Sequence, residues 1–490
     1  MADLKVLKNS GIYTLCNFLI KGLNFILLPI YTMYLTTADY GITGLMNNFQ
    51  SVLIIFCSFS LPMAVTRFYF DYRNDAENVK RYVGTMYCFT FLSSLLYCMV
   101  IGALQSWIMP LFFEGVDFMP TMLVTMVGMV FTGLYEIYQQ LLRSMERAAL
   151  SAITSIAYFI LSVALTCLFI IPLSMGANGV LLATAISGFV FVAVSIFDLV
   201  RKSMFKLCID LEILRGMLAY SIPLMPHNLS THVATLVSSV LLNGTGSLAA
   251  VGLYNVASKF GVVADILQSS MSSAYQPWLF RKLEERETSY KEQIASFTEM
   301  MLWIFAAIFV LLGLFIQEIV LLFLDSSYAE AWPLIPLIVG VYSIKTVYYF
   351  YVGVLFYYKK ASKFIFIATL SSSLLNVALS FVFIPWWGAY GSVLADAISM
   401  LLRVGIIIYM SKKCEDVGYR VWRFVRVTAT IVVVLGIGLV FSYSRFTYEL
   451  SLTNFLWKCF VFALFIALAC ITHKRFVGEL KGLLKSKLRR

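Results

Sequence analysis

The chain is built from apolar runs that are each long enough to cross a lipid bilayer. A spanning helix needs about 20 mostly apolar residues, because the hydrocarbon core is about 30 Å thick and a helix rises about 1.5 Å per residue. Only 13% of the 490 residues are charged, about half the share in ordinary soluble domains. We therefore expect an all-α polytopic membrane protein with about fourteen transmembrane helices. The runs are 11–35, 42–66, 84–108, 119–142, 150–172, 178–200, 214–242, 250–278, 297–317, 333–357, 364–385, 390–411, 424–443 and 453–472.

The basic residues are confined to alternate loops. With the N-terminus placed in the cytoplasm, 31 of the 37 Lys and Arg residues fall in cytoplasmic segments, and only Arg445 lies in an outer loop. Loops rich in Lys and Arg stay in the cytoplasm. We expect a multi-pass protein of the inner (plasma) membrane with both termini cytoplasmic. The net charge of +11 is thus explained by loops and does not indicate nucleic acid as a partner.

The sequence contains an internal repeat. Residues 176–187 and 388–399 share the pattern G-A-x-G-x-x-L-A-x-A-I-S at an offset of 212, and residues 38–41 correspond to 249–252 at an offset of 211. A near-constant offset predicts two homologous six-helix lobes in one orientation, related by an axis along the membrane normal. Substrate sites in such bundles lie at the interface between the halves.

The repeat also predicts the domain organisation. The first six-helix lobe takes up 1–202 and the second 203–415, and 416–472 adds two further transmembrane helices. The tail, 473–490, is basic and is expected to rest on anionic lipid. Pro29, Pro223 and Pro226 interrupt the first helix of each lobe. Such paired breaks mark either moving elements or kinks that serve packing alone.

Basic residues inside the apolar runs are the main functional candidates. Such a residue costs about 2.5–3.5 kcal/mol at a helix centre, so it normally faces a partner or a wet cavity. Lys21 and Lys259 lack an obvious local partner and predict a cationic cavity for an anionic head group such as a lipid diphosphate. Structural pairing across the halves is the alternative. Lys345 and Arg403 are further candidates for substrate binding.

Acidic residues inside the runs are fewer. Glu136, Asp265 and Asp396 are the candidates for ion coupling. Asp396 and Arg403 lie seven residues apart on one helical face, so bridging of neighbouring helices is an equally open role for them. Lys458 lies near the outer end of the last run, and we expect its ammonium group to extend to the membrane surface.

Motifs for other chemistry are missing from the sequence. There is no Gly-Lys-Ser/Thr phosphate loop and no HExxH motif, and three histidines cannot assemble a metal site. Most of the nine cysteines lie within apolar runs, where they behave as small core residues. We expect no cofactor, no metal and no enzymatic activity.

Several segments together are similar to family patterns. They are Leu28-Pro-Ile-Tyr-Thr-Met-Tyr-Leu-Thr-Thr-Ala-Asp-Tyr-Gly41, Ala64-Val-Thr-Arg-Phe-Tyr69, Leu142-Arg-Ser-Met-Glu-Arg147, Tyr220-Ser-Ile-Pro-Leu-Met-Pro226, Val251-Gly-Leu-Tyr-Asn-Val-Ala-Ser-Lys259 and Gln276-Pro-Trp-Leu-Phe280. Through them the chain resembles the Wzx-type polysaccharide flippases of the multidrug/oligosaccharidyl-lipid/polysaccharide exporter superfamily. The resemblance covers nearly the whole chain, and its specificity comes from the order of the segments.

The resemblance implies two six-helix lobes in a V around a cavity lined by helices 1, 2, 7 and 8. It implies that undecaprenyl-diphosphate-linked oligosaccharide moves from the inner to the outer leaflet by alternating access, for surface polysaccharide biosynthesis. Arg67, at the inner end of helix 2, would then guide the diphosphate in. The implied partners are this lipid-linked substrate, membrane lipids and a polysaccharide polymerase. Relatives often have an Asp–Arg pair late in helix 7, where this chain has Ser238-Ser-Val-Leu-Leu-Asn243.

Other functions remain open from the sequence. A lipid II flippase is close to the main hypothesis, and sequence separates the two poorly. A drug/cation antiporter of the same superfamily would need cavity carboxylates and usually has twelve helices. A membrane glycan polymerase or ligase would need a large outer loop with catalytic residues, which this chain lacks. A non-transporting assembly factor is the remaining alternative.

Overall fold

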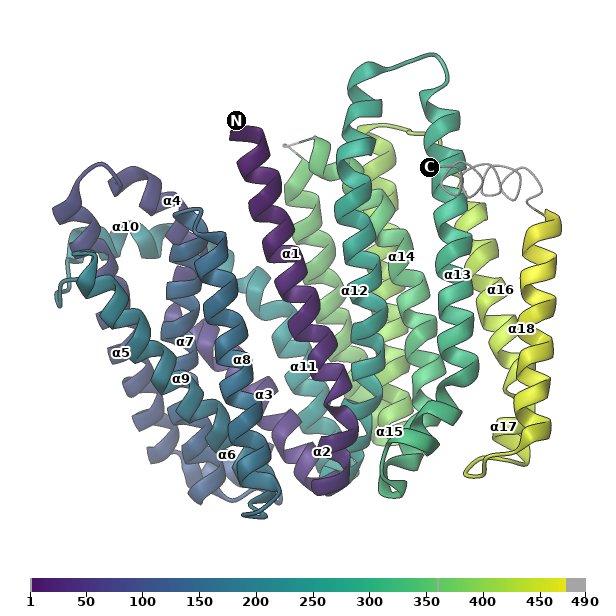
Figure 1. Cartoon of the computed structure of the whole chain (residues 1–490), viewed down its shortest axis with the longest axis horizontal. Coiled ribbons are helices and arrows are strands. Elements are labelled where there is room, and N and C mark those ends of the chain that lie inside the picture. Colours follow the sequence, from purple (N-terminus) through teal and green to yellow (C-terminus); the bar gives the residue numbers. More distant parts are fainter. Residues whose placement is uncertain (1, 359–360, 473–490) are drawn as a thin grey trace, which may run out of the picture. The chain divides into compact units, whose positions relative to one another are not determined.

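The computed structural model describes residues 2–358 and 361–472, and every regular element in these residues is a helix (Figure 1). The elements are α1 (Ala2–Ile26), α2 (Leu28–Tyr34), α3 (Thr37–Ser58), α4 (Leu61–Tyr72), α5 (Ala76–Ala103), α6 (Gln105–Phe112), η1 (Phe118–Met122), α7 (Leu123–Ser144), α8 (Ala148–Ile170), α9 (Gly176–Arg201), α10 (Leu211–Ser221), η2 (Ile222–Leu224), α11 (Met225–Thr245), α12 (Leu248–Glu285), α13 (Tyr290–Phe323), η3 (Ser326–Leu334), α14 (Ile335–Tyr357), α15 (Ser362–Cys414), α16 (Val421–Gly438), α17 (Val440–Ser444) and α18 (Leu452–Thr472).

The predicted all-α membrane class is confirmed. In the described residues, 12 helical segments are long and apolar enough to cross a bilayer. One of them, α15, has 53 residues and bends at Gly388, so it supplies two spans. The α10–η2–α11 segment overlaps the predicted run 214–242, but it is too polar to be counted among the 12. The number of spans is therefore close to the fourteen expected from the sequence.

The predicted breaks in the first helix of each lobe are also confirmed. The first helix is interrupted at Leu27, and Pro29 lies in the first turn of α2. The seventh is interrupted by η2, which contains Pro223, and Pro226 lies in the first turn of α11. Proline lacks a backbone N–H and fixes its φ angle, so it fits the first turn of a new helix better than the interior of a continuous one.

The packing of the chain divides it into two units. Unit 1 consists of Met1–Asn255 and Ser373–Ser392, and unit 2 of Val256–Ser372 and the chain from Val393 onward. Unit 1 thus contains the whole predicted first lobe together with parts of the predicted second lobe. The division into lobes at residue 202 stays a prediction, and the predicted basic tail lies outside the described residues.

In unit 1, α7 is the central helix. It packs against α3, α4, α5, α8 and α9. Leu134, Ile137, Tyr138 and Leu141 are buried on it. Gly128 of α7 lies against Ala185 of α9, and this pair of small residues lets the two helices approach closely.

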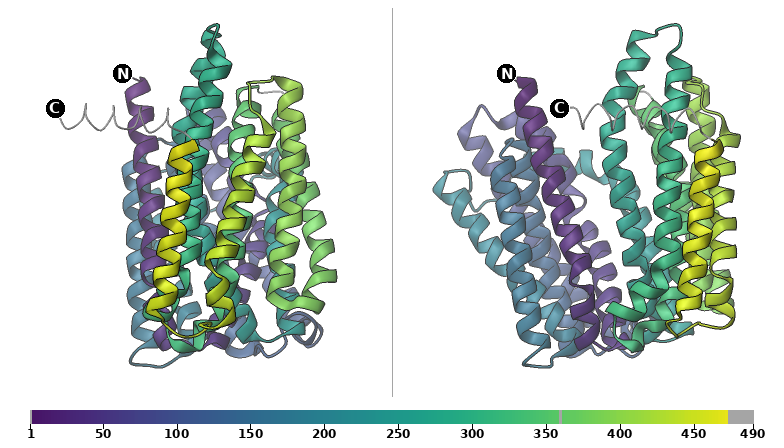
Figure 2. Two further views of the ribbon diagram at one scale, coloured as in Figure 1. Left: turned by 90° about the vertical axis from the view of Figure 1, so that its right-hand side faces the viewer. Right: turned by 45° about the vertical axis from the view of Figure 1, so that its right-hand side comes forward.

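In unit 2, α13 packs against α14, α16 and α18 (Figure 2). The contact with α18 is polar. The Lys458 ammonium lies 2.7 Å from a Glu318 carboxylate oxygen and donates to the side-chain amide oxygen of Gln317 at 2.8 Å. Gln317 also accepts a hydrogen bond from Asn454. The expectation that Lys458 reaches the membrane surface was wrong: its side chain is fully buried, because α13 supplies a carboxylate beside it.

Candidate functional site

The two lysines singled out in the sequence have no partner in the part of the chain that the structure describes. Lys21 lies on α1, which packs on α8, and Lys259 lies on α12. Both side chains are exposed in the absence of a membrane. Neither has a hydrogen bond or an ion pair with any described residue. The alternative of structural pairing therefore receives no support from the described part of the chain.

Arg67 lies in the middle of α4. It is exposed, and its guanidinium carbon lies 5.6 Å from the ring centroid of Tyr220 on α10. This is cation–π distance. The contact leaves the N–H groups of the guanidinium available to an anion.

The structure joins two residues to which the sequence assigned different roles. Lys345 of α14 lies 2.6 Å from an Asp265 carboxylate oxygen of α12. The same oxygen accepts a hydrogen bond from the Tyr349 hydroxyl at 2.9 Å. The Lys345 ammonium also lies 5.2 Å from the ring centroid of Tyr342. Lys345 is thus neutralised inside unit 2, unlike Lys21 and Lys259.

The remaining candidates lie apart from this pair. Arg403 of α15 is half-buried and donates a hydrogen bond from Nε to the Ser372 hydroxyl at 2.8 Å. Asp396 is half-buried on α15, two turns before Arg403. Glu136 is exposed on α7 and has no hydrogen bond or ion pair with the described residues. Glu136 is therefore a carboxylate that could still take up a cation.

Sequence reasoning missed a set of short polar residues on α11. The Asn48 amide of α3 donates to the Ser239 hydroxyl at 2.9 Å, and the Ser238 hydroxyl lies 3.1 Å from that of Ser380. The Asn243 amide donates to the Glu114 carbonyl oxygen at 2.9 Å. These bonds link α11 to α3, to the loop before η1 and to α15 within unit 1. The Ser238–Asn243 segment could have indicated these contacts, because it places short polar side chains inside an apolar run. We interpreted it only as a difference from the family pattern.

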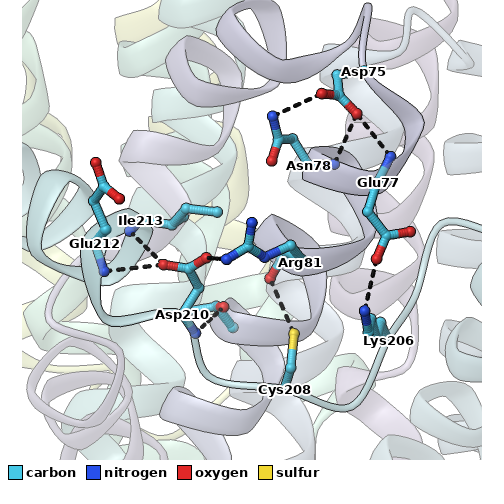
Figure 3. A network of polar contacts seen from close by, with 10 residues as sticks. Asp75, Glu77, Asn78, Arg81, Lys206, Cys208, Asp210, Glu212 and Ile213 are labelled. Atoms are coloured by element: carbon cyan, nitrogen blue, oxygen red, sulfur yellow. Dashed lines mark hydrogen bonds and ion pairs between the residues drawn. The ribbon is translucent and has the colours of Figure 1, made fainter.

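A second network lies at the start of α5 and holds the connector between the predicted lobes (Figure 3). The Lys206 ammonium lies 2.7 Å from Glu77, and Arg81 forms an ion pair with Asp210. The Asp210 N–H donates to the Thr85 hydroxyl at 2.9 Å. Lys206, Asp210 and the Cys208 thiol between them all contact α5. The connector is therefore fixed to the first lobe and is not a loose linker.

Charge and capping both stabilise this network. Hydrogen bonds from Lys206 and Lys80 lower the pKa of Glu77, and the Glu77 carboxylate raises the pKa of Lys206. Asp75 caps α5 by accepting from the N–H of Glu77 at 3.0 Å. Asp210 caps α10 in the same way by accepting from the N–H of Glu212 at 3.0 Å.

The sequence and structure resemble known proteins. The family model described as polysaccharide biosynthesis protein matches residues 6–283. The lipid II flippase MurJ in an inward closed conformation is 14% identical, with a TM-score of 0.70 over 95% of this chain and 99% of that chain. An inward-facing multidrug resistance MATE family transporter of the MOP superfamily is 16% identical, with a TM-score of 0.59 over 84% of this chain and 94% of that chain. The Vibrio cholerae MATE transporter VcmN in the bent form is 13% identical, with a TM-score of 0.50 over 85% of this chain and 99% of that chain.

Comparison with curated protein sequences gives no match. The structural matches nevertheless show that the fold is that of the MurJ and MATE transporters, which confirms the fold inferred from the resemblance. The family match covers more than half of the chain. The chain therefore belongs to the polysaccharide biosynthesis protein family, as a multi-pass membrane protein with the fold of the MurJ and MATE structures.

Proposed function

We propose that this protein flips undecaprenyl-diphosphate-linked oligosaccharide from the inner to the outer leaflet of the plasma membrane. Membership of a polysaccharide biosynthesis family supports the sugar part of the substrate. The fold shared with a lipid II flippase supports the lipid-linked part. The observation that carries the proposal is that Lys21 and Lys259, inside helices long and apolar enough to span a bilayer, have no hydrogen-bond or ion-pair partner among the described residues.

The physical argument rests on the cost of an unpaired charge. An ammonium group within a spanning helix is unfavourable unless water or an anion meets it. Charge-assisted hydrogen bonds to phosphate oxygens are short and strong, so a diphosphate head group would satisfy an ammonium group of this kind. A neutral sugar alone would leave both charges uncompensated. Lys21 and Lys259 are therefore the proposed diphosphate ligands, and Arg67 is the proposed first contact from the cytoplasm.

The other charged candidates receive secondary roles in the proposal. Lys345 and Arg403 can contact substrate only after leaving Asp265 and Ser372, their present partners. Asp265 is thus proposed to control when Lys345 becomes free, and Asp396 and Glu136 remain the other candidates for ion coupling. The substrate crosses with its bonds intact, so no catalytic residue is required. A polysaccharide polymerase that takes up the flipped product is the proposed partner.

Two related functions are distinguished by chemistry. A lipid II flippase would use the same diphosphate contacts, and the match to MurJ favours it as the second candidate. A cation antiporter would rely on free carboxylates, of which the spanning helices offer Glu136. Lys21 and Lys259, which have no carboxylate partner among the described residues, favour an anionic passenger over a cationic drug.

The test is flipping by purified protein in liposomes. Fluorescent polyprenyl-diphosphate oligosaccharide and lipid II are supplied in separate samples, and the fraction protected from an added glycosidase or reductant is followed. Lys21→Ala with Lys259→Ala should abolish flipping of the oligosaccharide lipid, whereas Lys21→Arg with Lys259→Arg should retain most of it. Correct folding is checked by gel filtration. Wild-type flipping by the double alanine variant would refute the role of the lysines, and flipping of lipid II alone would favour the second candidate.

A further inference from the structure

Two glycines hold α3 and α12 together at the starts of these helices. Gly41 of α3 lies against the carbonyl group of Leu248, and Gly252 of α12 lies against the carbonyl group of Thr37. A Cβ atom at either glycine would collide with the opposite backbone. All four residues belong to unit 1. The two helix backbones therefore touch directly, with no side chain between them.

These contacts follow the internal repeat. Gly41 and Gly252 are separated by the repeat offset of 211, and so are Thr37 and Leu248. Gly41 contacts Leu248, and its repeat equivalent Gly252 contacts Thr37, which is the repeat equivalent of Leu248. This reciprocity is the mark of an isologous interface, in which a two-fold axis passes between the partners. The pseudo-symmetry axis of the repeat passes between Gly41 and Gly252.

One turn further along, the interface continues with a third equivalent pair. Gly44 and Asn255 are also 211 residues apart, and a Cβ atom on Gly44 would lie 2.5 Å from the Asn255 amide carbon. Beyond this pair, the Asn48–Ser239 hydrogen bond connects α3 to α11. The contact therefore extends over more than two turns of α3.

The start of α3 is itself rigid. Thr36 and Asp39 form a capping box, and the second carboxylate oxygen of Asp39 accepts the N–H of Ala177 on α9 at 3.0 Å. These bonds fix the α3 terminus to the first lobe. A movement that separates the lobes at this end would therefore occur at the glycine contact and not within α3.

We propose that the Gly41–Gly252 contact, with the Gly44–Asn255 pair beside it, is the outer seal of the transport path. The inference rests on the proposed function and on the predicted orientation, in which α1 and α2 cross the membrane once and α3 begins at the outer side. Small residues let helices approach closely in membranes, where association depends on packing. A seal made of two backbones closes without a gap, and it opens without unpacking large side chains. The seal is closed in this structure and must part when substrate leaves.

Disulfide locking tests the seal directly. In a variant with its nine native cysteines replaced by serine, Gly44→Cys is combined with Asn255→Cys. Their Cβ atoms should come within disulfide range in the closed state, since a Cβ–Cβ separation of about 3.5–4.5 Å suffices. Oxidation should cross-link the pair, protect both thiols from alkylation and stop flipping, and reduction should restore flipping. Flipping at the uncrosslinked rate after complete oxidation, or failure of the pair to cross-link, would overturn the proposal.

The disulfide holds the seal closed, whereas a larger side chain at either glycine should favour the open seal. Gly41→Ala or Gly252→Ala should hold the helices apart and raise the outward-open population by about tenfold. The readout is labelling of Asn47→Cys, on the exposed face of α3, by a membrane-impermeant maleimide added outside. The matched control is Gly102→Ala in α5, where a Cβ atom meets nothing within 4 Å. Control-level labelling of both seal variants, with insertion intact, would overturn the proposal. Neither readout depends on the substrate, so the seal can hold even where the proposed oligosaccharide is not transported.

Discussion

The pair of Lys345 and Asp265 offers a sharp test of how charges are held inside this protein. Its oppositely charged atoms lie 2.6 Å apart, and the two side chains are 20% and 28% exposed. At an effective dielectric constant of about 20, the gross attraction at this distance is about 6 kcal/mol. Desolvation offsets most of this attraction. The pair is therefore expected to contribute little net stability, whereas removing one partner leaves an uncompensated charge among apolar helices.

The expected losses of stability follow from this difference between removing one charge and removing both. Breaking a fully buried pair costs about 3–5 kcal/mol. Because about a quarter of each side chain is exposed, we expect about 2 kcal/mol for Asp265→Asn or Lys345→Met alone. The double variant removes both charges and should lie within about 1 kcal/mol of the unaltered protein. The coupling between the two sites would then be at least about 3 kcal/mol, at the upper end of what contacting residues show.

The assay is denaturant unfolding in mild detergent, followed by flipping in liposomes. Lys80→Met provides the control. The Lys80–Glu77 pair is 3.4 Å apart, and its side chains are 31% and 53% exposed, so the substitution should cost less than about 0.5 kcal/mol. A double variant as unstable as the sum of the single variants would refute the reasoning. If the double variant is stable yet does not flip substrate, Lys345 has a role in transport beyond pairing. If it flips normally, the pair is structural.

Three further predictions concern the contacts that hold the helices in place. Lys458→Met should lower the free energy of unfolding by about 3 kcal/mol, because the Glu318 carboxylate then has no cation beside it. Adding Glu318→Leu should recover most of the loss, and thermal unfolding measures both changes. Asp210→Ala should cost about 1–2 kcal/mol through loss of the α10 cap, and limited proteolysis should then cut the connector 203–210 faster; unchanged cleavage would contradict the cap's role. The pKa of Glu77 is lowered by Lys206, so its contribution is present above its ordinary pKa of 4.5 and is lost as the pH falls through the lowered value. Connector cleavage should therefore rise below that pH, and Glu77→Gln should remove this dependence.

The spans and their interruptions could be predicted because the information is local. A run of about 20 apolar residues specifies a spanning helix by itself, and Pro29 and Pro223 act on the turns in which they lie. The repeat offset was visible for the same reason, since it compares two stretches of sequence and needs no three-dimensional contact. The 12 candidate spans in the described residues are close to the fourteen predicted helices.

The partners of the charged residues could not be predicted, because they depend on which face of one helix meets which face of another. Lys345 lies 80 positions from Asp265, and Lys458 lies 140 positions from Glu318. The depth of a charged residue along its helix therefore indicated the free-energy cost of burying its charge, but it did not indicate which residue would pair with it. The equivalence of Gly41 and Gly252 was in the sequence, but their contact across the pseudo-symmetry axis was not.

The two groups of charged residues differ in a way that bears on function. Lys345 and Lys458 each lie beside a carboxylate from a neighbouring helix, so their charge is already compensated when the protein folds. Lys21 and Lys259 have no such partner among the described residues. A carboxylate held beside either of them would have to be displaced before an anion could bind, and that displacement would weaken binding by about the strength of the ion pair. Under the proposed function, lysines without such a partner avoid this loss, but they require water around them until an anion binds. In the proposed function, the negative charge of a diphosphate compensates these ammonium groups, whereas a cationic passenger would add to their charge.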